Sequence, residues 1–555
     1  MTDTFLLAMA QTSQIVGDIA GNVARMRAAR ITATRDGAEL VVYPELNLAG
    51  YPPEDLVLKP AFQEAIATAV DELARLTADG GPAMLVGAPW RMNGKLYNAA
   101  LLLDGGKIAA TRLKHDLPNY GVFDEKRVFA TGPLPGPVVF RDKVRLGVMI
   151  CEDMWTADCA ECLVESGAEL LVVPNGSPYE SDKPDERLDL AVARVGETDL
   201  PLVYVNRVGG QDELVFDGAS FVLNADRGLA AQAPSFAEAV VTTRWSKGGN
   251  GRWTCAQGEI VKPAEGLDAV YQALTMGLRD YVTNNRFPGV ILGLSGGIDS
   301  ALTAAIAVDA LGADKVWAVM MPSPYTSQES LDDASEVARL LGIRLDTISI
   351  EPAMKAFGTM LAATFDGRAA DVTEENIQSR CRGIALMALS NKFGHMVVST
   401  GNKSEMSAGY ATLYGDMCGG FAVLKDVYKT TIFKLARWRN QTLPLAAKGP
   451  AGRVMPENVI TRPPSAELRP DQTDEATLGP YVELDDILFC LVEKEMSVAE
   501  IVARGHDAAV VHRVWRMLDI AEYKRRQAPP GVKITRRAFG RDRRYPITNA
   551  FRAPG

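Results

Sequence analysis

The sequence predicts an α/β protein of two domains. Short runs rich in Val, Leu and Ile alternate with stretches of helical periodicity along the chain, a pattern typical of parallel sheets covered by helices. With 555 residues, the chain is too long for a single hydrophobic core. The pattern fails near residues 244–265, which contain a Gly-rich stretch followed by a Pro-containing one. We therefore expect domains at 1–255 and 266–555, joined by a linker at 256–265.

Each expected element of the first domain rests on one of these two patterns. Apolar runs predict strands at 5–11, 40–43, 84–87, 99–103, 144–150, 170–173 and 202–205. Helical periodicity predicts helices at 22–35 and 61–76. A polar Asn-Ala-Asp-Arg-Gly turn within 216–228 predicts a hairpin.

The second domain continues the alternation. Helices are expected at 267–284, 301–307, 330–341 and 375–392, and strands at 290–294, 316–320, 344–350 and 396–399. A polar, Pro-rich stretch at 449–480 is long enough to be a functional or mobile loop.

Composition and charge exclude several classes of protein. A net charge of -10 argues against nucleic acid as the default partner, and no apolar stretch reaches the ~18 residues that a membrane span needs. The seven cysteines are few, odd in number and scattered, which is typical of unpaired thiols in a reducing compartment. We expect a cytoplasmic protein without a membrane or nucleic-acid partner.

One strand–loop–helix carries specific chemistry. The apolar run 290–294 is followed by Ser-Gly-Gly-Ile-Asp-Ser at 295–300 and then by the expected helix. Two glycines allow a tight turn that brings backbone N–H groups close to a ligand, and the helix N-terminus favours anions. The loop lacks the Lys of a Walker A motif, which argues against transfer of a γ-phosphoryl group. We expect it to hold pyrophosphate as the AMP half of ATP passes to an acceptor.

Three side chains at strand ends form a candidate nucleophilic site. Cys151 follows the strand expected at 144–150, where α/β enzymes place nucleophiles. A thiol with a pKa of ~8.5 is mostly protonated at neutral pH, so it needs a base and a nearby cation. Glu45 and Lys114 follow two other apolar runs and supply candidates for both.

The motifs around these residues resemble the nitrilase (carbon–nitrogen hydrolase) superfamily. They are Pro-Glu at 44–45, Lys-x-x-Leu-Pro at 114–118 and Cys-Glu-Asp at 151–153. The resemblance implies an αββα sandwich and the following roles: Cys151 attacks an amide carbon, Glu45 transfers protons and Lys114 stabilises the oxyanion. It also implies that Glu125 orients this triad. By the same resemblance, glutamine is bound by Tyr120, Ser177 and Lys183. Cys159 and Cys162 form a Cys-x-x-Cys without a second ligand pair, so we expect a structural role within one helix turn.

The segment from residue 266 onward resembles the NAD synthetases, which belong to the pyrophosphate-loop ATPases. Besides the loop at 295–300, the resemblance rests on motifs at 376–380, 399–405, 414–416, 464–468 and 523–525, together with Lys429. It implies a Rossmann-type parallel sheet related to the adenine nucleotide alpha hydrolases. Leu413 departs from the pattern, because ammonia-using relatives have a Lys there.

This second resemblance also implies ligand contacts. ATP is expected at Gly293, Leu294, Ser295, Gly296, Gly297, Ile298, Asp299, Ser300, Thr400, Lys429 and Ser465. Deamido-NAD⁺ is expected at Asn376, Arg380, Glu405 and Lys524. Asp299 and Glu405 can jointly hold Mg²⁺, which prefers oxygen ligands and bridges phosphates. Because Lys429 lies in a helical pattern, a plain exposed lysine is the alternative there.

Together, the two resemblances imply one reaction. The first domain hydrolyses glutamine, and the second adenylates deamido-NAD⁺ with ATP before ammonia displaces AMP. They also imply a homo-oligomer, at least a dimer through the second domain.

Two alternatives remain. One is another pyrophosphate-loop amidotransferase that aminates a nucleotide. The other is an RNA-modifying enzyme of the same group, because residues 524–544 carry nine Lys or Arg. A solvated or intersubunit surface is the interpretation we favour for this basic segment.

Overall fold

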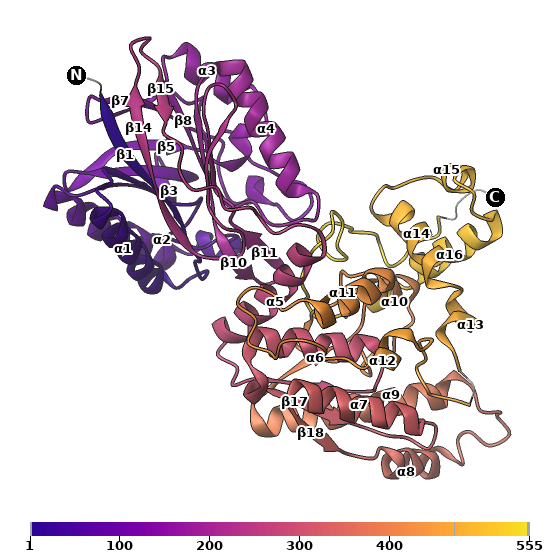
Figure 1. Cartoon of the computed structure of the whole chain (residues 1–555). Coiled ribbons are helices and arrows are strands. Elements are labelled where there is room, and N and C mark those ends of the chain that lie inside the picture. Colours follow the sequence, from indigo (N-terminus) through magenta and orange to yellow (C-terminus); the bar gives the residue numbers. More distant parts are fainter. Residues whose placement is uncertain (1–2, 471, 552–555) are drawn as a thin grey trace. The chain divides into compact units, whose positions relative to one another are not determined.

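The computed structural model describes residues 3–470 and 472–551. The chain divides into two compact units, Met1–Ala264 and Glu265–Gly555 (Figure 1). Each unit is described by itself below.

The first unit contains two sheets. One has the strand order β15-β14-β1-β2-β3-β4-β5, and the other has the order β13-β12-β9-β8-β7-β6. The strands of the first sheet are β1 (Thr4–Gln11), β2 (Leu40–Val42), β3 (Ala83–Met92), β4 (Lys95–Asp104), β5 (Lys107–Leu113), β14 (Ala239–Lys247) and β15 (Trp253–Cys255). Those of the second are β6 (Val138–Phe140), β7 (Val144–Val148), β8 (Leu170–Asn175), β9 (Leu202–Asn206), β12 (Phe221–Leu223) and β13 (Leu229–Gln232). A separate pair is β10 (Val208–Gln211) with β11 (Leu214–Asp217).

Alternating side chains on β1 show how the layers form. Phe5, Leu7 and Met9 enter a core shared with strands of the second sheet. The smaller Ala8 and Ala10 face a different core, to which α1 (Ile19–Arg35) and α2 (Pro60–Leu76) contribute. Successive strand residues point to opposite faces, so both faces of this sheet are covered.

The second sheet is covered in the same way. Its outer core includes side chains of α3 (Asp158–Glu165) and α4 (Lys183–Thr198). The resulting helix–sheet–sheet–helix order confirms the expected αββα sandwich.

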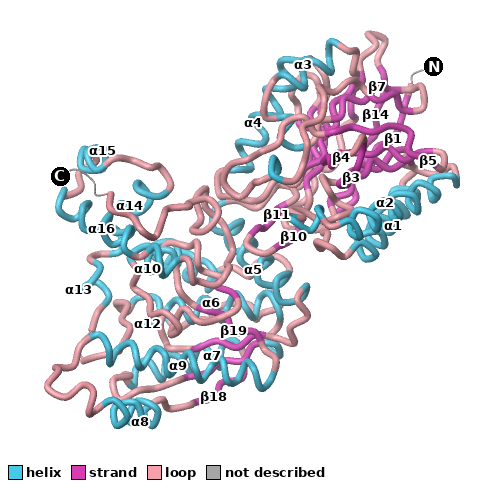
Figure 2. The backbone as a smooth tube through the Cα atoms, turned by 180° about the vertical axis from the view of Figure 1, so that it is seen from behind, coloured by secondary structure: helices cyan, strands magenta, loops and turns pink. Residues whose placement is uncertain are grey.

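The second unit contains one parallel sheet with the order β18-β17-β16-β19-β20. Its strands are β16 (Val290–Gly293), β17 (Val316–Met320), β18 (Arg344–Thr347), β19 (Met396–Ser399) and β20 (Phe421–Ala422). The helices of this unit (cyan in Figure 2) are α5 (Gly266–Asn284), α6 (Ile298–Leu311), α7 (Gln328–Leu341), α8 (Glu351–Leu361), α9 (Val372–Phe393), α10 (Lys403–Ala408), α11 (Lys429–Gln441), α12 (Glu457–Thr461), α13 (Asp474–Leu478), α14 (Tyr481–Val492), α15 (Val498–Ala503), α16 (Ala508–Ile520) and α17 (Glu522–Arg525).

The strand order places the Ser-Gly-Gly loop at a topological switch point. Central β16 pairs with β17 on one side and with β19 on the other. In open α/β sheets, ligands bind at the carboxyl ends of strands where the order reverses in this way. The loop leaves the carboxyl end of β16 and leads into α6.

Three sequence predictions need correction. The hairpin with its polar turn at 224–228 is confirmed, but its bounds are wrong: it is formed by β12 and β13, whereas residues 216–217 belong to β11, which pairs with β10. The stretch 449–480 contains two short helices, α12 and α13. In the basic segment 524–544, the predicted surface is wrong for Arg525, Lys533 and Arg543, which are buried and paired with carboxylates.

Among the described residues, no helix combines the length and the apolar character that crossing a membrane requires.

Candidate active sites

The first candidate site gathers buried side chains from three strand ends of the αββα unit. Glu45 follows β2, Lys114 follows β5, and Cys151 opens a single 3₁₀ turn just after β7. Lys114 Nζ lies 2.7 Å from Glu45 Oε1 and 2.9 Å from Glu125 Oε2. The structure therefore places the Lys114 ammonium between the two predicted glutamates.

Further donors hold both carboxylates in place. Glu45 Oε2 accepts a hydrogen bond from the Gly176 backbone N–H at 3.0 Å, and the Tyr51 hydroxyl donates to Glu125 at 2.9 Å. Asn98 Nδ2 donates to Glu45 at 2.7 Å and to Glu125 at 3.3 Å. Sequence reasoning missed Asn98 and Tyr51. The only signal for Asn98 is its place directly before the apolar run 99–103.

The carboxylates of Glu45 and Glu125 both pair with the single ammonium of Lys114, so carboxylate groups outnumber ammonium groups in this buried place. Burial raises the pKa of Glu125 to about 7; Lys114 opposes the shift and Glu45 adds to it. Burial alone would lower the pKa of Lys114, but the two glutamates raise it well above its ordinary value. Lys114 therefore stays a cation, and Glu125 can take up a proton near neutral pH.

Cys151 lies on a strained turn that Asp153 secures. The backbone of Cys151 has a φ of 49°, in the left-handed region that non-glycine residues rarely adopt. Asp153 Oδ2 accepts from the Ile150 N–H at 2.9 Å, and its Oδ1 accepts from the backbone N–H groups of His115 and Asp116. One carboxylate thus joins the turn of the nucleophile to the segment that follows Lys114.

Burial favours the protonated form of the Cys151 thiol. Burial raises the pKa of Cys151 well above its ordinary value, Glu45 adds to the increase, and Lys114 opposes it. A nucleophilic role for this sulfur would therefore require a proton acceptor nearby.

The predicted glutamine contacts lie in two places beside this cluster. The Tyr120 hydroxyl donates to Glu152 at 3.0 Å, and Lys183 Nζ lies 4.4 Å from the ring centroid of Trp155. The positive charge of Lys183 also acts on Glu152. Glu152, which follows the nucleophile directly, is a site residue that sequence reasoning did not assign.

Ser177 belongs to a rigid buried network. Its Oγ accepts from Arg187 Nε at 3.0 Å, and Arg187 Nη1 lies 2.7 Å from Asp217 Oδ1. Ser177 directly follows Gly176, the residue that donates to Glu45. Sequence reasoning did not identify Arg187 or Asp217.

The Cys-x-x-Cys pair lies on α3, within one helix turn as predicted. All seven cysteines are free thiols, which confirms the expectation from their number and spacing.

The second candidate site is a cavity of about 290 Å³ at the carboxyl end of β16. Of the fifteen predicted ligand residues of the second unit, eleven were expected to bind ATP. Ten of those eleven line the cavity, together with Glu405. These lining residues are Gly293, Leu294, Ser295, Gly297, Ile298, Asp299, Ser300, Thr400, Glu405, Lys429 and Ser465.

Gly296 allows the loop to pack closely instead of lining the cavity. It has a φ of 84°, and a Cβ there would lie 2.3 Å from the backbone oxygen of Ser330. The Ser300 hydroxyl accepts from the Ser295 N–H at 3.2 Å and donates to the Gly297 carbonyl at 2.9 Å. These contacts hold the loop in the shape that leads into α6.

Acidic groups surround a single lysine in this cavity. Lys429 Nζ contacts the Asp299 carboxylate and lies 3.5 Å from Glu405 Oε1. Burial raises the pKa of Glu405 to about 8; Asp299 adds to the shift and Lys429 opposes it. Asp474, also buried, lines the same cavity, and its Oδ1 has no hydrogen-bond partner among the described residues. Lys429 is 1% exposed, so the alternative of a plain surface lysine is wrong.

The donor set of this cavity fits a divalent cation with oxygen ligands. Asp299 and Glu405 present carboxylate oxygens in a region where negative charge exceeds positive charge. Mg²⁺ prefers such ligands and is held by one or two carboxylates together with phosphate oxygens.

Asn376, Arg380 and Lys524 are not among the described residues that line the cavity. Each of them instead makes a hydrogen bond to the segment 409–413. Tyr410, within this segment, lines the cavity. Lys524 Nζ donates to the carbonyl of Gly409 at 2.7 Å, and Arg380 Nε donates to that of Leu413 at 3.2 Å. Asn376 Oδ1 accepts from the hydroxyl of Thr412, the next residue before Leu413 in the chain, at 2.9 Å.

Two cavity arginines were missed by sequence reasoning. Arg462 Nη2 donates to the Gly296 carbonyl at 3.3 Å, and Arg382 Nε donates to the Met321 carbonyl at 3.1 Å. Arg462 directly precedes two prolines in the stretch 449–480, and no motif signals its role.

Glu125 should make stability depend on pH. Its folded pKa of about 7 exceeds the ordinary value of 4.5, so the folded chain holds this proton more tightly than the unfolded chain. The stability contributed by the group is present below about pH 4.5 and is lost as the pH rises through about 7. Glu125→Gln should abolish this loss. The melting temperature of the variant minus that of wild type should therefore increase between pH 5 and pH 8. Exposed Glu64 provides the control Glu64→Gln, and a difference that is constant across this range would contradict the assignment.

Known proteins match both units. A carbon–nitrogen hydrolase family model matches residues 6–250, and an NAD synthase family model matches residues 270–528. The glutamine-dependent NAD(+) synthetase of Rhodobacter capsulatus is 50% identical over 552 residues, covering 100% of both chains. That of Acinetobacter baylyi is 46% identical over 553 residues, covering 99% of each.

A solved structure agrees over the full length. The glutamine-dependent NAD+ synthetase from Acinetobacter baumannii, in complex with adenosine diphosphate, has a TM-score of 0.78 and 43% sequence identity, with 100% of both chains covered. With two sites of matching chemistry and relatives of this identity along its whole length, the chain belongs to the glutamine-dependent NAD⁺ synthetase family.

Proposed function

We propose that the chain converts deamido-NAD⁺ to NAD⁺, with glutamine as the nitrogen donor and ATP as the activating substrate. The products are NAD⁺, glutamate, AMP and pyrophosphate. The observation that carries the proposal is that one chain holds both a buried Cys–Lys–Glu cluster and a phosphate-binding loop with acidic neighbours.

The first site supplies ammonia. Glu45 takes the proton of the Cys151 thiol, and Sγ attacks the glutamine amide carbon. The same proton then leaves with ammonia, and water hydrolyses the thioester to glutamate. Lys114 stabilises the oxyanion together with the backbone N–H that follows Cys151; one such donor typically contributes about 10²–10³ in rate.

The charges of Lys183 and Glu152 match those of an α-amino acid substrate. Lys183 suits the α-carboxylate of glutamine, and Glu152 with Tyr120 suits its α-ammonium group. Ser177, held by Arg187, suits the substrate backbone.

The second site activates the acceptor. The nicotinate carboxylate of deamido-NAD⁺ attacks the α-phosphorus of ATP, while the 295–300 loop, Lys429 and Arg462 hold the departing pyrophosphate. Asp299 and Glu405 would hold Mg²⁺, which supplies neutralisation of phosphate charge when bound. Thr400 and Ser465 complete the ATP contacts, and Asn376, Arg380 and Lys524 shape the segment that receives the dinucleotide. Ammonia then displaces AMP.

As in our sequence interpretation, we propose a homo-oligomer, at least a dimer through the second unit.

Cys151→Ala tests whether glutamine hydrolysis and NAD⁺ formation take place at separate sites. The variant should lose NAD⁺ synthesis supported by glutamine and keep synthesis supported by ammonium, because only the first site uses the thiol. Product is measured as NAD⁺ formed with each nitrogen donor, and Cys162→Ala is the matched control. Loss of both activities in a folded variant would contradict the two-site proposal.

Asp299→Asn tests the second site. Removing one carboxylate should lower deamido-NAD⁺-dependent exchange between ATP and pyrophosphate by about 10² or more, because transition-state charge is no longer balanced. Hydrolysis of glutamine alone should persist. Asp366→Asn, at an exposed position of the same unit, should behave like wild type. Unchanged exchange in Asp299→Asn would refute the assigned role.

A further inference from the structure

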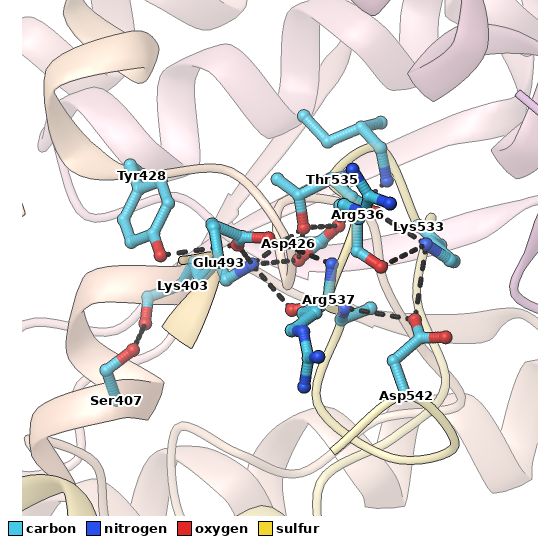
Figure 3. Close-up of polar contacts among 12 residues, drawn as sticks. Lys403, Ser407, Asp426, Tyr428, Glu493, Lys533, Thr535, Arg536, Arg537 and Asp542 are labelled. Carbon is cyan, nitrogen blue, oxygen red and sulfur yellow. Dashed lines mark hydrogen bonds and ion pairs between the residues drawn. The ribbon is translucent and has the colours of Figure 1, made fainter. Parts of the chain in front are cut away.

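A buried ion cluster fastens the C-terminal segment to α10 (Figure 3). Lys403 Nζ lies 2.7 Å from Asp426 Oδ1, contacts Glu493 Oε1, and donates to Thr535 Oγ1 at 2.7 Å and to the Arg537 carbonyl at 2.9 Å. We call these five residues the Lys403 cluster. None of them is among the residues that line the described cavity of the second site.

The segment 533–542 supplies much of this cluster through its backbone. The N–H groups of Ile534 and Thr535 donate to Asp426 Oδ2 at 2.8 and 2.7 Å, and that of Arg537 donates to Glu493 at 2.9 Å. The Thr535 hydroxyl also donates to Asp426 at 2.9 Å. Although burial opposes it, the pKa of Asp426 is lowered by Lys403 and by Lys533. The contacts thus favour the charged form of Asp426, and removing one of its partners leaves a buried carboxylate with fewer contacts.

The same lysine begins the helix that carries Glu405, one of the two acidic groups of the second site. Lys403 is the first residue of α10, between the N-cap Asn402 and Glu405. Asn402 Nδ2 donates to Asp299 Oδ1 at 2.8 Å, and Asn402 Oδ1 accepts from the Glu405 N–H at 2.9 Å. The Lys403 backbone N–H donates to the Val427 carbonyl at 3.0 Å. The position of this helix turn therefore sets the spacing between Asp299 and Glu405.

We propose that Lys403 is a positioning residue for the divalent cation of the second site, and that segment 533–542 holds it in place. This inference rests on the proposed function, because Asp299 and Glu405 are its assumed ligands. Lys403 acts through Asn402 and Glu405 and does not touch the cation. Outer contacts of this kind typically change metal affinity or activity by about 10–100-fold.

Thr535→Val tests the proposal with little change in shape. It removes the hydroxyl that accepts from Lys403 and donates to Asp426. In the full-length variant, we expect the Mn²⁺ concentration for half-saturation to rise about tenfold, measured by electron paramagnetic resonance with a non-hydrolysable ATP analogue. The kcat for ammonium-supported synthesis should fall, while the KM for ammonium stays at its wild-type value. Thr535→Ser keeps the hydroxyl and should retain wild-type Mn²⁺ binding.

Arg537→Ala is the matched control from the same segment. The Arg537 side chain pairs with exposed Glu495 at 2.6 Å, and only its backbone joins the cluster, so Mn²⁺ binding should not change. Weaker binding confined to Thr535→Val supports the proposal. Wild-type binding in Thr535→Val, an equal loss in Arg537→Ala, or an unfolded Thr535→Val would overturn it, because the cluster would then serve stability alone. Failure of the wild-type chain to bind Mn²⁺ with the analogue would instead refute the proposed function.

Discussion

At three places in the described part of the chain, a buried lysine lies against two carboxylates. We call each such group a triplet. The candidate chemistry depends on how the triplets balance their charge. Lys114 lies between Glu45 and Glu125. Lys429 contacts Asp299 and Glu405, and Lys403 contacts Asp426 and Glu493. Two carboxylates around one ammonium leave an excess negative charge, which is costly away from water unless something compensates it.

The three triplets resolve that excess differently. Burial and neighbouring carboxylates raise the pKa of Glu125 to about 7 and that of Glu405 to about 8. A group of this kind can take a proton or a cation, which suits a general-base site and a metal site respectively. In the Lys403 cluster, Lys533 and several backbone N–H groups complete the balance, and the pKa of Asp426 is lowered. This third triplet is therefore suited to hold structure.

The folds determine where these triplets form. In the αββα unit, three strand ends bring Glu45, Lys114 and Cys151 to one buried place. In the second unit, the reversal of strand order beside β16 opens the crevice that the Ser-Gly-Gly loop enters. The acidic groups come from α6 and α10, which are a hundred residues apart in the chain but lie within one hydrogen bond of each other through Asn402.

The sequence by itself determined the α/β class, most strand positions, the Ser-Gly-Gly loop and the candidate site residues Cys151, Glu45 and Lys114. Local sequence patterns predict these features: an apolar run, a glycine pair and a charged residue at a strand end. Only the tertiary structure decided that Asn98 joins the two glutamates, that Arg462 enters the cavity and that basic residues near the C-terminus are buried. The partners of Asn98 and Arg462 lie tens to more than a hundred residues away, so no local pattern predicts these contacts. The tertiary structure also decided the burial of each lysine and its carboxylates, and burial is the main cause of the raised pKa values of Glu125 and Glu405.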